Sequence, residues 1–342
     1  MSNRLMIAAA IFLAAFRAAA QPAPDEAAPQ AGAATQEALQ ASADYGATIT
    51  PLVNEGLALL GEITDLSGRY LLGFTAPETY ADDRGAVAAA HADIGARVAR
   101  LQEASAALAE PQPGPYAERS LELLRYIRKF AADLGEARAA LDRLPALVEA
   151  GDAVGFDAAR ADIFQYSSNS VRAENAILTA NQLYAPLGHP EYHLIEAIKN
   201  GNVVIADLLD LMQLANAGRR DGLDVIADRV AAHHRGIGVS LDAAAALAET
   251  LERKVTAPSP AQKDGLAALA QSYRKAIAIE RRIGDGLADY APIARAIAAG
   301  EEPAAFKARL DKVGALVGPL VAERQAALAA KQKAAIELSG KS

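Results

Sequence analysis

The chain has 342 residues, of which 52% are hydrophobic and only 5% aromatic, and it contains neither cysteine nor tryptophan. The lack of cysteine excludes disulfide bonds and thiolate chemistry. The net charge of −8 disfavours nucleic acid as a partner, because binding to phosphates requires a basic face. Alanine, the best helix former, supplies much of the apolar content, so the composition favours closely spaced helices over a sheet.

The N-terminus has the pattern of a secretory signal peptide. Arg4 precedes an apolar run from Leu5 to Phe16, and three small residues, Ala18 to Ala20, follow. The apolar run is about 12 residues long, which is too short to span a bilayer comfortably. We therefore expect cleavage near Ala20, a periplasmic or secreted protein, and no integral membrane segment afterwards. Residues 21–36 are rich in proline and alanine, and we expect them to form a disordered tether.

The rest of the chain contains an internal repeat. Four apolar stretches recur in the same order at offsets that grow from 142 residues, between Leu52 and Leu194, to 150 residues, between Phe156 and Phe306. The most specific shared element is His-x-x-Ile-Gly, which begins at His91 and again at His234. Each stretch has apolar residues at alternating steps of three and four, which predicts one buried face on a long helix.

Helix breakers separate these stretches. They are Pro77, the PQPGP run at 111–115, Gly151-Asp152, the APLGHP run at 185–190, the AGRRDG run at 217–222, Ser259-Pro260 and Gly300. Short links between long helices make neighbours antiparallel. We therefore predict an all-α fold: a tandem duplication of an up-down-up-down four-helix bundle, with about eight long helices. The first bundle comprises residues 37–186 and the second residues 187–342. A straight rod is an alternative, although Pro186 and Pro190 favour a bend between the bundles.

The repeated histidines lie on the apolar face of the second helix of each unit. In an antiparallel hairpin, residues equidistant from the loop lie level with each other. This reflection pairs His91 with Asp65 and His234 with Asp207. We expect both pairs to form hydrogen bonds that satisfy a polar group near the core and fix the helix register.

Two functional readings of these pairs compete with the structural one. The carboxylate could stabilise a charged imidazolium and make each pair sensitive to pH. Alternatively, Gly95 and Gly238, one turn after the histidines, could leave a notch for a metal or ligand. Two ligands from two helices are too few for a strong metal site unless other helices contribute.

Other candidate residues are weaker. A few polar side chains could contact a ligand or partner, namely Tyr166 and Asn169 in a polar helical stretch, and Glu280 on an apolar face. Weak candidates for a metal site are His189, His193 and Glu196. The sequence contains no nucleophile elbow, phosphate-binding loop or zinc-protease motif. We therefore expect no enzymatic activity and no cofactor.

The sequence thus favours an exported, non-catalytic helical protein that binds or scaffolds components of a bacterial cell envelope. The expected partner is another envelope protein or a small ligand. A periplasmic carrier of a small molecule or metal, with sites between helices, is the first alternative. An enzyme of unrecognised type is the second.

Overall fold

The computed structural model of the chain describes residues 33–114, 117–182, 185, 187–251, 259–301, 303–317 and 319–339. Nearly all of these residues are helical and no strand occurs among them, which confirms the predicted all-α class. Within the same ranges, no helix combines the length and the apolar character that crossing a membrane requires. The expected signal peptide, and residues 21–32 of the expected tether, lie outside the described residues.

The first half of the chain forms four long helices: α3 (Ala33–Thr75), α4 (Pro77–Ala106), α5 (Ala117–Ala150) and α6 (Ala153–Gln182). Helix α3 begins inside the expected tether, so residues 33–36 are helical. Pro77 occupies the first position of α4, where its missing N–H costs no helical hydrogen bond. The breakers expected at Pro77, at 111–115 and at Gly151-Asp152 therefore separate these helices as predicted.

Local chemistry explains the turn between α5 and α6. Gly151 has a φ of +65°, a left-handed conformation that glycine adopts without steric cost and that ends α5. The Asp152 carboxylate then accepts a hydrogen bond from the backbone N–H of Gly155 at 2.9 Å. This contact satisfies one of the free donors at the start of α6, so the predicted stop and N-cap are both present.

The second half begins with three more long helices, α7 (Pro190–Asn216), α8 (Leu223–Thr250) and α9 (Pro260–Gly286). The predicted cap at Ser259 is a full capping box. Its hydroxyl accepts from the Gln262 N–H at 3.2 Å, while the Gln262 side chain accepts from the Ser259 N–H at 2.9 Å. Glycines with positive φ, Gly218 and Gly222, lie in the link between α7 and α8.

The last quarter differs from the prediction of two further uninterrupted helices. After α9 come a short 3₁₀ turn (Leu287–Asp289), α10 (Tyr290–Ala298), α11 (Pro303–Val317) and α12 (Leu320–Ser339). Pro292 has no N–H to offer the preceding turn, and Pro319 stands directly before α12. Each of the two expected helices is therefore interrupted once.

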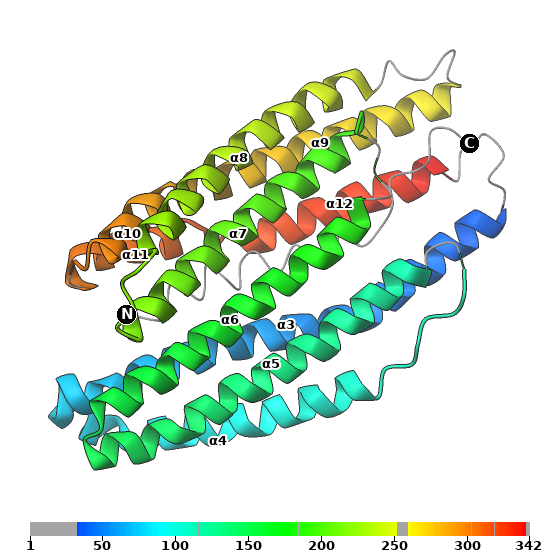
Figure 1. Ribbon diagram of the computed structural model, residues 1–342. Helices are drawn as coiled ribbons and strands as arrows, with labels where there is room; N and C mark the ends of the chain where they lie inside the picture. The colour runs from blue at the N-terminus through cyan, green and yellow to red at the C-terminus, as the bar shows by residue number, and fades with distance from the viewer. Residues whose placement is uncertain are drawn as a thin grey trace.

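Figure 1 shows two groups of roughly antiparallel helices, with α3 to α6 below and α7, α8, α9 and α12 above, while α10 and α11 lie at one end. Helix α6 packs along α7 and joins the groups. Buried apolar side chains of both groups form one continuous core. Since α6 and α7 lie side by side and antiparallel, the chain reverses between them, and the straight-rod alternative is wrong.

Two glycines of α3 allow close contact with α5. A Cβ on Gly56 of α3 would lie 2.5 Å from the Phe130 ring of α5, and one on Gly73 would lie 2.4 Å from Val148. A side chain at either position would therefore force the Phe130 or Val148 side chain of α5 to shift.

Candidate functional site

His91 does not pair with Asp65. Its ring lies among three helices, with Nδ1 2.7 Å from the Tyr70 hydroxyl of α3 and Nε2 2.6 Å from Oδ1 of Asp142 on α5. Both ring nitrogens are therefore occupied, and the predicted pair is wrong. Equal distance from the hairpin loop predicts which residues lie level along the two helices, but not toward which neighbouring helix a side chain points. The carboxylate that binds His91 comes from the third helix, α5. Asp65 is instead half-buried, and this burial raises its pKa, although Arg69 acts in the opposite direction.

The pair expected between His234 and Asp207 is also wrong. Asp207 is fully buried and accepts hydrogen bonds from two guanidinium groups, Arg172 of α6 at 2.7 Å and Arg229 of α8 at 2.8 Å. His234 donates from Nε2 to the backbone carbonyl of Gly284 on α9 at 3.0 Å. The neighbouring His233 contacts Asn200 of α7, which is seven residues, or nearly two helical turns, before Asp207. The histidines of α8 therefore lie level with Asn200 and not with Asp207.

The glycines beside the histidines do not form equivalent notches. A Cβ on Gly95 would lie 3.3 Å from the Arg138 guanidinium, so that side chain already covers the glycine. A Cβ on Gly238 would meet nothing within 4 Å, and this residue is exposed. The ligand notch expected at both positions is thus filled in the first half, and in the second it is open surface.

Tyr70, His91 and Asp142 form a hydrogen-bonded chain. An ionised carboxylate only accepts hydrogen bonds, so Nε2–H of His91 donates to Asp142, while Nδ1 shares the second hydrogen bond with the Tyr70 hydroxyl. Burial raises the pKa of Tyr70 to about 12, which keeps the phenol protonated. No lone pair on the ring is left for a metal, so the arrangement fits a structural bond that links α3, α4 and α5.

A buried charged cluster lies where the two groups of helices meet. Glu280 of α9, which the sequence placed on an apolar face, is 3% exposed and forms an ion pair with Arg324 of α12, which is 1% exposed. Glu174 of α6 is fully buried nearby, and Asn202 of α7 donates to its Oε2 at 3.0 Å. Burial raises the pKa of Glu174 to about 8, although the charge of Arg324 opposes this shift. At neutral pH this carboxyl group is therefore mostly protonated.

A second buried ion pair lies further along the same helices. Glu191 of α7 pairs with Lys331 of α12 and accepts a hydrogen bond from the Tyr273 hydroxyl of α9 at 2.9 Å. The Lys331 ammonium also lies 5.3 Å from the centre of the Tyr273 ring. Arg324 and Lys331 are seven residues apart on the buried face of α12. Sequence reasoning missed them, although two cations in an otherwise apolar heptad row gave a signal.

The other predicted residues are held in local contacts. His189 caps α7 by accepting from the Glu191 N–H at 3.2 Å, and His193 donates to the Leu187 carbonyl at 3.1 Å. Glu196 accepts from Gln182 and Lys199. Asn169 accepts from Gln165, and Tyr166 packs against the core. The described ranges contain no group of three or more His, Asp or Glu side chains placed to hold a metal ion.

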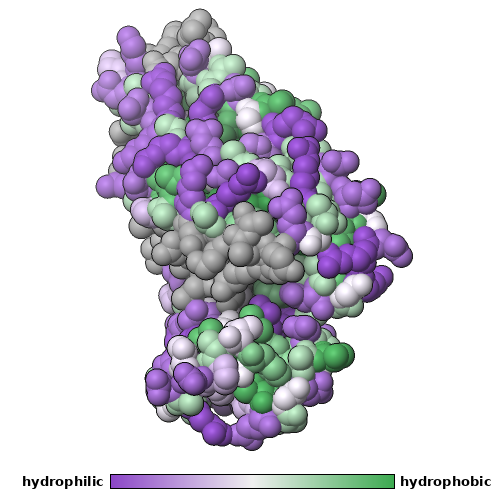
Figure 2. Space-filling view, turned by 90° about the vertical axis from the view of Figure 1, so that its left-hand side faces the viewer, coloured by the Kyte–Doolittle hydropathy of each residue, from purple (hydrophilic) through white to green (hydrophobic). Residues whose placement is uncertain are grey.

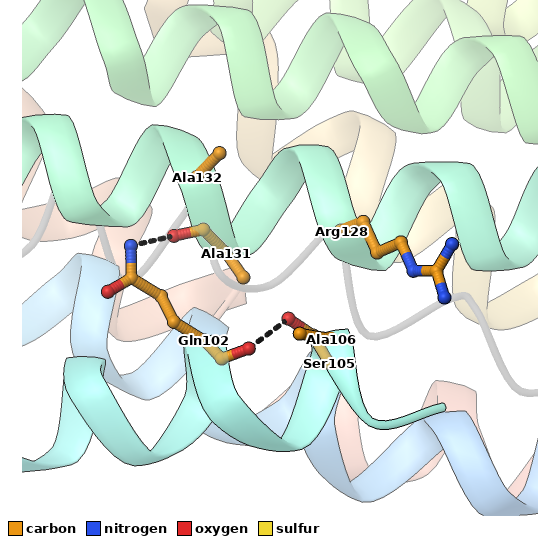
Figure 3. Close-up of a pocket in the computed structure, with 6 residues that line it drawn as sticks. All are labelled: Gln102, Ser105, Ala106, Arg128, Ala131 and Ala132. Atoms are coloured by element: carbon orange, nitrogen blue, oxygen red, sulfur yellow. Dashed lines mark hydrogen bonds between the residues drawn. The ribbon is translucent and has the colours of Figure 1, made fainter. Parts of the chain in front are cut away.

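A hollow of about 380 Å³ lies between the end of α4 and the first half of α5 (Figure 3). Its lining consists of Gln102, Ser105, Ala106, Arg128, Ala131 and Ala132. The Gln102 side chain donates a hydrogen bond to the Ala131 carbonyl at 3.3 Å. The Arg128 side chain points along α5, away from Gln102 (Figure 3). None of the residues singled out from the sequence lines this hollow. Half of its lining is alanine, so few polar groups would orient a ligand.

Comparisons of the chain with models of protein families, with curated proteins and with solved structures find no match.

Proposed function

We propose that the chain is an exported, non-catalytic helical protein that binds or scaffolds other components of a cell envelope. Its N-terminal sequence, a cation followed by an apolar run and three alanines, supports export. The long helices offer extended faces, which suit contacts with proteins better than they suit enclosure of a small substrate.

One observation carries the proposal: two of the residues that the sequence singled out as a possible site, His91 and Asp207, are engaged by neighbouring side chains, whereas several large apolar side chains are exposed. Both nitrogens of His91 and both carboxylate oxygens of Asp207 are bound by neighbouring residues. Val154, by contrast, is 83% exposed directly after the turn between α5 and α6. Figure 2 looks onto this end of the molecule, and hydrophobic residues gather in its lower part, over the α3–α4 and α5–α6 turns. Exposed apolar surface of this kind is typical of protein-binding sites.

We also propose that residues 37–186 and 187–342 are two copies of one four-helix unit. Two features support the duplication. His91 and His234 each bond to the third long helix of their own half, α5 and α9. In addition, α11 and α12 both run antiparallel to α9 and the turn after it, without a change of register between them. Lys312 of α11 pairs with Asp289 of that turn, and Glu323 of α12 pairs with Arg282 of α9. Their packing against α9 resembles the packing of α6 against α5. In a crystal structure of the protein, the two halves should superpose over the repeated stretches, from Leu52 with Leu194 to Phe156 with Phe306. A different helix order in the two halves would contradict the duplication.

The alternative, a carrier of a small molecule or metal, depends on the hollow of Figure 3. Native mass spectrometry of the protein from its own envelope fraction, before and after a chelator, separates the two proposals. A mass that lacks residues 1–20 supports export. A stoichiometric small adduct, or a metal that the chelator removes, would favour the carrier, whereas a complex with another protein or a bare chain favours the scaffold.

A further inference from the structure

Buried polar side chains form a row along the junction of the two groups of helices. On α6 the row consists of Glu174 and Asn181, and on α12 of Arg324 and Lys331. The members of each pair are seven residues apart, which is nearly two helical turns or about 10.5 Å, so they lie on one face of their helix. Helices α6 and α12 run in the same direction (Figure 1), and the charge of Arg324 acts on Glu174. The row therefore has a first level at Glu174 and Arg324 and a second level at Asn181 and Lys331.

At the first level, two buried oxygen atoms have unused hydrogen-bonding capacity. Nδ2 of Asn202 donates both to Oε2 of Glu174 and to Asn175. Oε1 of Glu174 and Oδ1 of Asn202 are shielded from solvent, and neither forms a hydrogen bond with any described residue. Because this carboxyl group is mostly protonated at neutral pH, its Oε1 holds a proton that requires an acceptor, while Oδ1 of Asn202 requires a donor. A single water molecule can satisfy both atoms, since water donates and accepts.

Asn181 has the same unused capacity at the second level. It is 5% exposed, and both Oδ1 and Nδ2 lack hydrogen-bond partners among the described residues. A buried amide without partners is costly, so such groups in folded proteins are usually satisfied by ordered water. Buried Ala327 lies between the two levels on the same face of α12, three residues after Arg324 and four before Lys331. Its short side chain leaves more room beside the polar groups than a longer apolar residue would.

We propose that the junction of the two groups of helices binds ordered water molecules at both levels, one bridging Glu174 of α6 to Asn202 of α7 and others solvating the amide of Asn181 beside Lys331. A metal cation fits this place less well than water, because Arg324 and Lys331 already bring two positive charges. Water-mediated bonds thus join α6 to the upper group in addition to the direct contacts. This inference goes beyond the proposed function and depends neither on export nor on a partner.

A high-resolution crystal structure of the full chain tests the proposal directly. Ordered water should lie within about 3.2 Å of Oε1 of Glu174, Oδ1 of Asn202 and both amide atoms of Asn181. The structure of N181L, in which leucine has nearly the volume of asparagine but no polar side-chain atom, should lose the water of the second level. It should keep the water of the first level, which serves as an internal control. Direct hydrogen bonds of these three side chains to protein groups, or a cation at either level, would overturn the proposal.

Urea unfolding provides an independent readout in solution. If water satisfies Asn181, N181L removes those hydrogen bonds and should lower the urea midpoint by about 0.5 M. If the amide has no partner, leucine removes a costly buried polar group and the midpoint should rise, which would contradict the proposal. N169L makes the same exchange at a half-buried position of α6 and controls for the higher helix propensity of leucine. The N181L crystal structure shows whether leucine fits without moving α12, so a loss caused by steric misfit is recognised.

Discussion

At the scale of single residues, the partners of a buried polar group decide its chemistry. Asp207 and Glu174 are both fully buried carboxyl groups. Asp207 accepts hydrogen bonds from two guanidinium groups, whereas Glu174 receives one amide hydrogen bond and lies near a cation that already pairs with Glu280. The two guanidinium groups offset the cost of burying the Asp207 carboxylate, whereas Glu174, which lacks such partners, holds a proton instead.

Glu174 should make the protein less stable as the pH rises. Its folded pKa of about 8 lies above its ordinary value of 4.5, so between these values the folded state holds a proton that the unfolded state has lost. The free energy of unfolding should therefore fall as the pH increases from about 5 to 8, by up to about 1.4 kcal/mol per pH unit. Glu174→Gln, which cannot ionise, should flatten this dependence and be more stable than the parent at pH 8.5. Urea unfolding across this pH range measures both effects, and parallel curves for the two proteins would contradict the assignment.

Asp142 and Asp65 provide a matched comparison at the same scale. Asp142→Ala removes the acceptor of His91 and should lower the free energy of unfolding by about 1 kcal/mol, since the carboxylate is partly exposed. Asp65→Ala removes a half-buried carboxylate that has no contact with His91 and should change stability by less than about 0.5 kcal/mol. Denaturant unfolding of both variants tests the corrected partner. A larger loss for Asp65→Ala would restore the pair expected from the sequence.

At the scale of helices, caps and breakers set where each element begins and ends. Gly151 and Asp152 end α5 and start α6, and Ser259 and Gln262 close a reciprocal cap on α9. These contacts involve residues at most three positions apart, so the sequence contains everything they need. The interruptions after α9 and before α12 depend in addition on neighbours. Gly286, for example, packs so closely against α11 that a Cβ would lie 2.5 Å from Val317.

Loss of the cap on α9 should have a measurable cost. Ser259→Ala leaves the Gln262 N–H without its acceptor and should lower the free energy of unfolding by about 1 kcal/mol. Ser259→Asp, which keeps an acceptor at the N-terminus of the helix, should retain most of the stability. Thermal unfolding of the two variants provides the measurement. An equal loss of stability in Ser259→Ala and Ser259→Asp would show that the protein needs the serine hydroxyl itself and not merely a hydrogen-bond acceptor at the start of α9.

At the scale of the whole molecule, polar contacts cross the interior where apolar packing alone would leave the helices free to slide. Glu191, Tyr273 and Lys331 connect α7, α9 and α12, and Glu174 with Asn202 connects α6 to α7. Interlocked polar groups of this kind specify a register, because a shift of one turn would leave buried charges unpaired. The two groups of helices are therefore held by position-specific contacts in addition to their shared apolar core.

Breaking the ion pair on α12 should destabilise the whole protein. Lys331→Met leaves Glu191 buried without a cation and should lower the free energy of unfolding by about 3 kcal/mol. The double variant Glu191→Gln with Lys331→Met removes both charges and should recover most of this loss. Urea unfolding of the single and double variants measures the coupling. A double variant no more stable than Lys331→Met would show that the lysine contributes by packing rather than by charge.

The sequence by itself determined the all-α class, the turns at Pro77 and Gly151, and the caps at Asp152 and Ser259, because backbone hydrogen bonding and chain geometry within a few residues control these features. Only the tertiary structure decided the partners of His91 and the buried state of Glu174. Heptad spacing fixes which face of a helix is buried, but the rotation of that face and the arrival of a third helix fix which side chains meet. The hydrogen bond from His91 to Asp142, 51 residues along the chain, depends on that three-helix geometry and not on the hairpin that contains the histidine.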